Sequence, residues 1–178
     1  MAWETNVISR GPPSALPRLR DAIHSGMNEK TLAILEKLIA VCQDRAEGFD
    51  LAANEVHASE LQSLFQGYSL QRLRRAGELE SAASALGRII SAETGVVSEA
   101  GRTWMAPADK AAVRDEQAVL LECERGEEAA LAAYTVALEE AELPPAIRAT
   151  IAAQALEVKD AHKEIHERRS RFAPDAAD

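Results

Sequence analysis

The stretch LEKLIAVCQDRAEGFDLAANEV (residues 35–56) carries apolar side chains at alternating steps of four and three residues. That spacing places them on one face of an α-helix, whereas a half-buried β-strand would need an apolar residue at every second position. The apolar positions are Leu35, Ile39, Cys42, Ala46, Phe49, Ala53 and Val56. The sequence therefore predicts a long amphipathic helix, which we place at residues 28–56.

The composition of the whole chain also favours helices. The 178 residues include 35 alanines but only nine glycines and seven prolines, and aromatic residues make up 4%. Alanine is the strongest helix former, and no proline occurs between Pro17 and Pro107. With 47% hydrophobic residues, a chain of this length can form one domain with a buried core.

The same period predicts three more helices, at about residues 60–86, 111–141 and 145–169. Gly87 is expected to end the second helix, and the Pro144-Pro145 pair to begin the fourth. The residues expected to face the core are, in chain order, Leu61, Phe65, Tyr68, Arg72, Arg75, Leu79, Ala82 and Leu86, then Leu120, Glu124, Glu128, Leu131, Thr135 and Leu138, and finally Ile147, Ile151, Gln154, Val158, Ala161 and Ile165.

The lengths of the connections predict how these helices are arranged. The short links near residues 58 and 143 make each flanking pair of helices antiparallel, and the connection of about twenty residues between the pairs can cross the length of a bundle. In it we expect a short helix carrying Trp104. The prediction is an all-α protein, a four-helix bundle of two antiparallel helical hairpins joined by a crossover with a short helix.

The predicted bundle spans residues 27–170. Residues 1–26 are expected to form a flexible N-terminal arm, because Pro12, Pro13 and Pro17 break helices. The arm is either native or an extension upstream of Met27, and a targeting peptide is a further alternative. Residues 171–178 are expected to be a frayed tail.

The net charge and the two cysteines limit which binding partners and which cellular location we expect. A net charge of −9 opposes nucleic-acid binding, and no apolar run reaches the length of about 18 residues that spans a bilayer. Cys42 and Cys123 form no CxxC motif and have apolar neighbours, so we expect buried thiols in a cytoplasmic protein. Self-association or a protein partner is the remaining expectation. Leu64, Leu70 and Leu73 could form a homodimer face, or they could widen the core stripe.

Five segments carry a resemblance to a known family. They are CQDRAEGF (42–49), LFQGYSLQR (64–72), ELESAASALG (78–87), ECERGEEAALAAYTVAL (122–138) and QALEVKDAHKEI (154–165). Over residues 28–169 the chain resembles a bacterial family of ferritin-like four-helix-bundle proteins catalogued as a domain of unknown function. The resemblance implies a ferritin-like fold and supplies no established activity.

Charged residues interrupt the predicted core faces at mid-height in all four helices. Folding the first hairpin about residue 58 puts Asp44 level with Arg72, and folding the second about residue 143 puts Glu128 level with Glu157. A buried charge is costly unless it is paired, so we expect salt bridges inside the bundle. The expected polar core consists of Asp44, Glu47, Arg72, Arg75, Glu124, Glu128 and Glu157. The alternative is that these charges lie on solvated faces.

A di-metal centre is the competing interpretation of the same residues. Di-iron bundles supply a Glu-x-x-His motif from each of two helices, and no such motif occurs in this chain. Arg72 and Arg75 stand where the second helix would carry one, and a guanidinium cannot bind a metal ion. Iron or another divalent metal would therefore need non-standard ligands, namely Glu47, Glu124, Glu128, Glu157 and His162. His162 and His166 also share a helix face, as zinc ligands do, although histidines near a helix C-terminus explain that spacing equally well.

No catalytic residues stand out. The chain has no phosphate-binding glycine loop, no GxSxG motif and no Cys–His pair at a recognisable spacing. We therefore expect a non-enzymatic interaction or assembly protein with an ionic, metal-poor core and no cofactor. The alternative is an iron-binding or di-metal carboxylate protein or oxidase.

Overall fold

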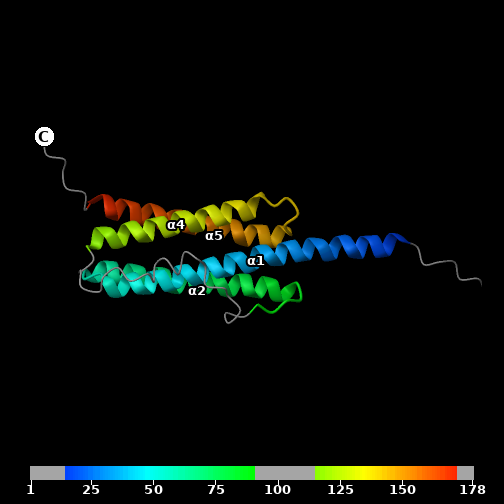
Figure 1. Ribbon diagram of the computed structural model, residues 1–178, viewed down its shortest axis with the longest axis horizontal. Coiled ribbons are helices and arrows are strands. Elements are labelled where there is room, and N and C mark those ends of the chain that lie inside the picture. Colours follow the sequence, from blue (N-terminus) through cyan, green and yellow to red (C-terminus); the bar gives the residue numbers. More distant parts are fainter. Residues whose placement is uncertain (1–14, 91–114, 172–178) are drawn as a thin grey trace, which may run out of the picture.

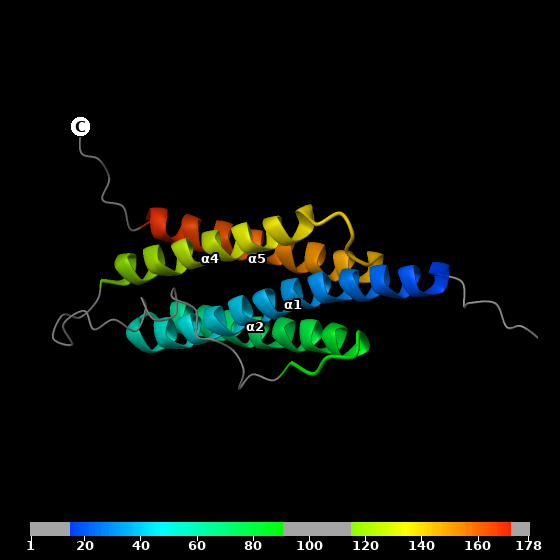
Figure 2. The same cartoon turned by 45° about the vertical axis from the view of Figure 1, so that its right-hand side comes forward.

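The structure, a computed structural model, describes residues 15–90 and 115–171, with side chains from residue 26 onward. These residues form four helices and no strand: α1 (Ala15–Glu55), α2 (Ser59–Ala85), α4 (Glu116–Glu139) and α5 (Pro145–Arg171). α1 pairs with α2, α4 pairs with α5, and α1 lies against α4 (Figures 1 and 2). The predicted all-α four-helix bundle is confirmed. The short helix expected around Trp104 lies outside the described residues.

α1 begins earlier than predicted. It starts at Ala15, so residues 15–26, which were expected to precede the first helix, are part of it. Pro17 is tolerated because it lies in the first helical turn, where backbone N–H groups have no acceptor within the helix. The first turns of α1, in dark blue, extend past the ends of the other three helices (Figures 1 and 2).

The ends of α2 are fixed by local backbone contacts and by a side chain from α4. Gly87 adopts a φ of 88°, and the N–H groups of Gly87 and Arg88 donate to the carbonyls of Ser84 and Ala83. This is the Schellman motif, for which glycine is the favoured residue. At the other end, Glu116 of α4 accepts hydrogen bonds from the N–H groups of His57 and Ala58.

The second hairpin differs from the predicted limits mainly at the start of α4, which was expected at about residue 111. α4 begins at Glu116, after Asp115 caps it by accepting a hydrogen bond from the N–H of Gln117 at 3.3 Å. It ends at Glu139, two residues before the predicted end. α5 begins at Pro145 as predicted and extends to Arg171.

Three of the four predicted core faces agree with the structure. Every residue predicted to face the core from α1 and α5 is buried. On α2 the predicted residues are buried except Tyr68, Ala82 and Leu86, which are half-buried. On α4 the prediction is wrong by one residue, because the buried face consists of Val119, Leu120, Cys123, Glu127, Ala130, Tyr134 and Ala137. One residue is a rotation of about 100° around a helix.

The apolar core is divided into two clusters. One contains the N-terminal part of the α1 core face, from Leu32 to Cys42, together with Leu79, Ile151 and Val158. The other contains Phe49 to Val56 together with Phe65, Leu120 and Ile165. Between the two clusters lies the layer of charged side chains described below. Within residues 15–90 and 115–171, no helix has the length and hydropathy needed to cross a membrane.

Deleting residues 1–26 tests how far the core extends along α1. The first buried residue described on α1 is Thr31, and the first ion pair is made by Glu29. We therefore expect the shortened protein to keep its thermal midpoint within a few degrees in a melt followed by circular dichroism. A large fall in the midpoint would show that the deleted residues pack against the bundle.

Candidate functional site

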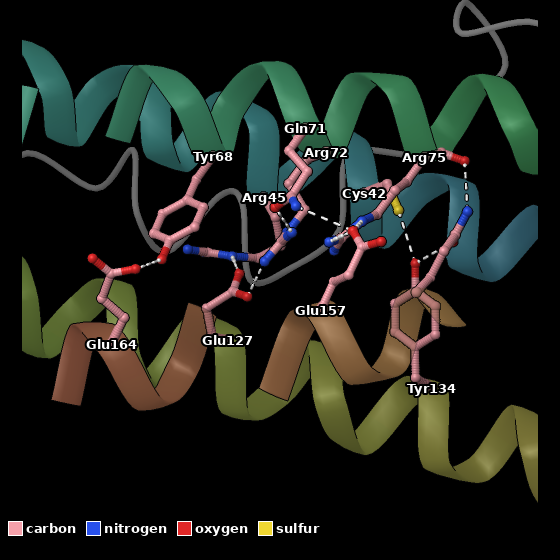
Figure 3. Close-up of polar contacts among 11 residues, drawn as sticks. Cys42, Arg45, Tyr68, Gln71, Arg72, Arg75, Glu127, Tyr134, Glu157 and Glu164 are labelled. Atoms are coloured by element: carbon pink, nitrogen blue, oxygen red, sulfur yellow. Dashed lines mark hydrogen bonds and ion pairs between the residues drawn. The ribbon is translucent and has the colours of Figure 1, made fainter. Parts of the chain in front are cut away.

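An ion pair between Arg72 and Glu127 occupies the centre of the bundle (Figure 3). Arg72 comes from α2 and is 1% exposed, whereas Glu127 comes from α4 and is 0% exposed. Nη2 of Arg72 donates to one carboxylate oxygen of Glu127, and Nη1 donates to the side-chain oxygen of Gln71 at 3.0 Å. A buried carboxylate is tolerated only when a cation and hydrogen-bond donors surround it, and here the sequence supplies both.

Arg45 of α1 binds the other oxygen of the same carboxylate. Its Nε donates to Glu127 at 3.3 Å, and its side chain is 12% exposed. The guanidinium lies against Gly126 of α4, where a Cβ atom would overlap it. Gly126 therefore leaves the space that lets Arg45 reach Glu127. One carboxylate thus holds together three helices, α1, α2 and α4.

Aromatic rings pack against these guanidinium groups. The Phe49 ring lies 5.9 Å from the ring of Phe65 and 5.2 Å from that of Tyr68. The guanidinium carbon of Arg45 is 4.8 Å from the centre of the Phe49 ring, and that of Arg72 is 5.6 Å from it. Such cation–π contacts are stronger where water is excluded, so the aromatic members of the second cluster stabilise the buried guanidinium groups in a way that aliphatic side chains could not.

A row of hydrogen bonds joins α2 to α5, whose backbones approach each other less closely than those of the other neighbouring pairs. Nε of Arg75 donates to Glu157 at 2.9 Å, and Nε2 of Gln71 donates to the same oxygen at 3.1 Å. On one side of this pair the hydroxyl of Tyr68 donates to Glu164 at 2.7 Å. Hydrogen bonds from Arg168 and Tyr68 lower the pKa of the Glu164 carboxyl. Figure 3 shows the long polar side chains that lie between α2 and α5.

A second polar chain runs through the neighbouring layer. The hydroxyl of Tyr134 donates to Oε1 of Gln154 at 2.8 Å and lies 3.2 Å from Sγ of Cys42. Nε2 of Gln154 donates to Glu78 at 2.7 Å. Because the hydroxyl proton is used toward Gln154, the Cys42 thiol is the donor in the remaining contact. Burial raises the pKa of Cys42, and it raises the pKa of Cys123 to about 12. At neutral pH both cysteines are therefore protonated, and their thiols are poor nucleophiles.

The structure brings together only some of the residues predicted for the polar core. Arg72 and Arg75 are buried, and Arg75 pairs with Glu157, whose side chain is 51% exposed. Glu47 and Glu128 are exposed, so their placement in the core is wrong, and Asp44 is half-buried.

Glu124 lies away from the central arginines. It binds Arg169 and Nδ1 of His166, the latter at 2.7 Å. Burial acts to raise the pKa of Glu124, but hydrogen bonds from Arg169 and His166 outweigh it and lower the pKa. The histidine partner of Glu124 is therefore His166, one helical turn beyond His162, and the rings of these two histidines stack with their centres 6.5 Å apart.

Sequence reasoning missed Arg45 and Glu127, which complete the central ion pairs. The large side chains of Leu131 and Leu138 favoured the wrong phase of α4, in which Glu124 and Glu128 face the core. The correct phase is visible in the sequence as Cys123, Glu127, Ala130, Tyr134 and Ala137, at steps of four, three, four and three. Small alanines allow α4 to pack closely, while Leu131 and Leu138 cover the edges of the core.

The central residues do not fit a metal ion. Arg72 and Arg75 can only donate hydrogen bonds, and both oxygens of Glu127 are taken by arginines. Nε of Arg72 and Nη1 of Arg75 are buried without an acceptor in the described part of the chain, which adds donors where a cation would need acceptors. No group of three or more His, Cys, Asp or Glu side chains suited to a metal occurs among the described residues. The set Glu47, Glu124, Glu128, Glu157 and His162 is spread over different layers and faces.

Replacing Arg72 with alanine tests the cost of this layer. Arg72→Ala leaves Glu127 buried without its main cation, so we expect a loss of about 3–5 kcal/mol in the free energy of unfolding, measured in urea. Arg74→Ala is the matched control, because Arg74 is exposed on the same helix and its loss should change that free energy by less than about 0.5 kcal/mol. Equal effects of the two substitutions would contradict a buried ion pair.

The space at Gly126 is tested by a double-mutant cycle with Arg45. Gly126→Ala should displace the Arg45 guanidinium and lower the free energy of unfolding by about 1–2 kcal/mol, even though alanine favours helices. In an Arg45→Ala background the obstacle is gone, so Gly126→Ala should instead stabilise the protein by about 1 kcal/mol. A destabilising effect in both backgrounds would show that Arg45 is not what the glycine accommodates.

Comparisons with known proteins agree with this architecture. Among solved structures, the chain is similar to a mutant of Dps1 from Mycobacterium smegmatis, with 13% sequence identity and a TM-score of 0.68. The match covers 81% of this chain and 97% of that chain. At this identity the likeness shows the fold alone, and the fold is therefore the ferritin-like bundle that the resemblance implied. A search of curated proteins found no match. Residues 30–140 match a family model, and because that model covers more than half of the chain, the protein belongs to the family described as domain of unknown function DUF2383.

Proposed function

We propose that this chain is a non-enzymatic ferritin-like protein that acts by interaction or assembly, with an ionic core that does not depend on a metal. The observation that supports it is the pairing of Arg72 with Glu127 at the centre of the bundle. Two guanidinium groups on α2 supply the positive charge that pairs with the buried carboxylate of Glu127 and with the half-exposed carboxylate of Glu157.

The chemistry of the buried groups also argues against an enzyme. Nucleophiles and acid–base catalysts need access to a substrate and a pKa close to the working pH. Burial raises the pKa of Cys42 and Tyr134. In the central layer, the arginines and Glu127 are occupied with one another. These side chains are therefore suited to stabilising the bundle and to holding its helices in register.

Metal binding can be tested directly on the purified protein. We expect elemental analysis of protein expressed in iron-rich medium to find iron well below one atom per chain. We also expect Fe²⁺ and Zn²⁺ to leave the thermal midpoint of the wild type within about one degree. Stoichiometric iron, or stabilisation by several degrees, would favour the alternative of an iron-binding or di-metal protein.

A variant with restored ligand spacing provides the positive control. Arg72→Glu combined with Arg75→His creates a Glu-x-x-His pattern facing Glu127 and Glu157, and it removes two positive charges from that layer. Like charges without a counter-ion repel, so we expect a low thermal midpoint without metal and a rise of several degrees when Zn²⁺ or Fe²⁺ is added. If metal stabilised the wild type as much as the variant, the arginines would not be what excludes it.

A further inference from the structure

In the central layer, the arginines outnumber the carboxylates that bind them. The guanidinium groups of Arg45, Arg72 and Arg75 meet two carboxylates, those of Glu127 and Glu157. Within the described part of the chain, no third carboxylate pairs with these arginines. Glu157 is half-exposed, so water screens its charge, whereas Arg72 and Arg75 are almost completely buried. Among the paired groups, one positive charge is therefore left over.

Each of the three arginines also has a buried nitrogen without an acceptor in the described part of the chain. These nitrogens are Nη2 of Arg45, Nε of Arg72 and Nη1 of Arg75. A buried donor that makes no hydrogen bond costs free energy, and such donors are rare enough in proteins to need an explanation. Because the donors belong to cations, the acceptor that suits them best carries negative charge.

The unpartnered donors of Arg72 and Arg75 belong to one place in the bundle. The two arginines are three residues apart on α2, which puts their side chains on the same face of the helix. Burial raises the pKa of the Cys42 thiol, and the positive charges of Arg72 and Arg75 act in the opposite direction, so both guanidinium groups lie near that thiol. Figure 3 shows the two groups next to each other. Adjacent cations repel, and an anion between them would remove the repulsion.

The surroundings limit the size of such an anion. Phe49 packs against Arg72, and the contact between Cys42 and Tyr134 lies next to both arginines of α2. These three side chains are at most 1% exposed. An organic anion would have to displace them, whereas a monatomic anion takes little more space than a water molecule. A water molecule would accept hydrogen bonds but would leave the positive charge unbalanced.

We propose that Arg72 and Arg75 hold one small inorganic anion, a halide such as chloride, in the interior of the bundle. Nε of Arg72 and Nη1 of Arg75 donate to it, and the guanidinium of Arg45 adds positive charge from α1. The inference rests on the ionic core of the proposed function and adds its ligand, which is an anion where a metal site would hold a cation.

Thermal unfolding in sodium chloride and in sodium gluconate at the same ionic strength tests the site in the full chain. Gluconate is a large organic anion, so it screens charges equally but does not enter the core. We expect the wild type to have a midpoint several degrees higher in chloride. The difference should grow with the logarithm of the chloride concentration, as it does for a ligand that binds only the folded state. Equal midpoints in the two salts would contradict the proposal.

Arg75→Gln separates a bound anion from a general effect of salt. The substitution removes one donor and one charge from the site, so this variant should have the same midpoint in chloride and in gluconate. Arg88→Gln is the matched control, because Arg88 also forms ion pairs, with Glu29 and Glu36, but its side chain is 43% exposed. This control should keep the full difference of the wild type. Equal loss of the difference in both variants would assign the chloride effect to the surface.

Glu157→Gln should change the chloride effect in the opposite direction. Glu157 is the carboxylate that binds Arg75, so its removal leaves that arginine without negative charge and favours the chloride-bound form. We expect the difference between the midpoints in chloride and in gluconate to be at least about twice that of the wild type. An unchanged or smaller difference would contradict an anion next to Arg75.

Crystals of the wild type grown in sodium bromide locate the ion directly. Bromide replaces chloride and scatters anomalously, so we expect one anomalous peak within hydrogen-bond distance of Nε of Arg72 and Nη1 of Arg75. A water molecule there without anomalous signal, or bromide at the surface only, would refute the proposal. Stoichiometric iron in the purified protein together with this peak would contradict the metal-poor core alone, whereas a metal-free protein without the peak would contradict this inference alone.

Discussion

The bundle depends on one carboxylate in its interior, that of Glu127, and on the two arginines that pair with it. Removing a charge from water costs several kcal/mol, and the cost is offset only where opposite charge and hydrogen bonds are well placed. Arg72 and Arg45 meet that need from two other helices. Alanine-rich helices can slide along one another with little loss of apolar contact, whereas these pairs form in a single register. The ionic layer therefore provides specificity where the apolar clusters mainly provide stabilisation.

The surrounding layer follows from that requirement. Gly126 provides space for Arg45, the ring of Phe49 faces two guanidinium groups, and Gln71 accepts a hydrogen bond from Arg72. Long polar side chains also fill the space between α2 and α5. The reason is the same, because the buried guanidinium of Arg75 requires a carboxylate partner, which Glu157 provides. The positive charge at the centre of this bundle comes from arginine side chains and not from a bound ion. A bundle built in this way has a polar interior without offering a ligand set to a metal ion.

The sequence was sufficient for the helices, their pairing and most of the core, and it singled out Arg72 and Arg75. It was insufficient for their central partner, because a one-residue shift in the phase of α4 exchanges Glu127 for Glu128. Side-chain size misled the choice: Leu131 and Leu138 are larger than Ala130 and Ala137, yet close packing selects the alanines. Arg45 was missed since the space for it depends on Gly126, which is distant in sequence. The start of α1 was missed because a proline was taken to break a helix whose first turn tolerates it.

The position of Glu127 also bears on the order of folding events. The contacts within each hairpin are closer in sequence than those between the hairpins, so we expect each hairpin to form before the two dock. While the α4–α5 hairpin is alone, its apolar face carries a carboxylate with no cation opposite it, and that face resists burial against an arbitrary hydrophobic surface. Its counter-charges, Arg45 and Arg72, both reside on the other hairpin. Docking of the hairpins is therefore the step at which the charge is matched, and the rate of that step should depend on ionic strength and on the integrity of both arginines.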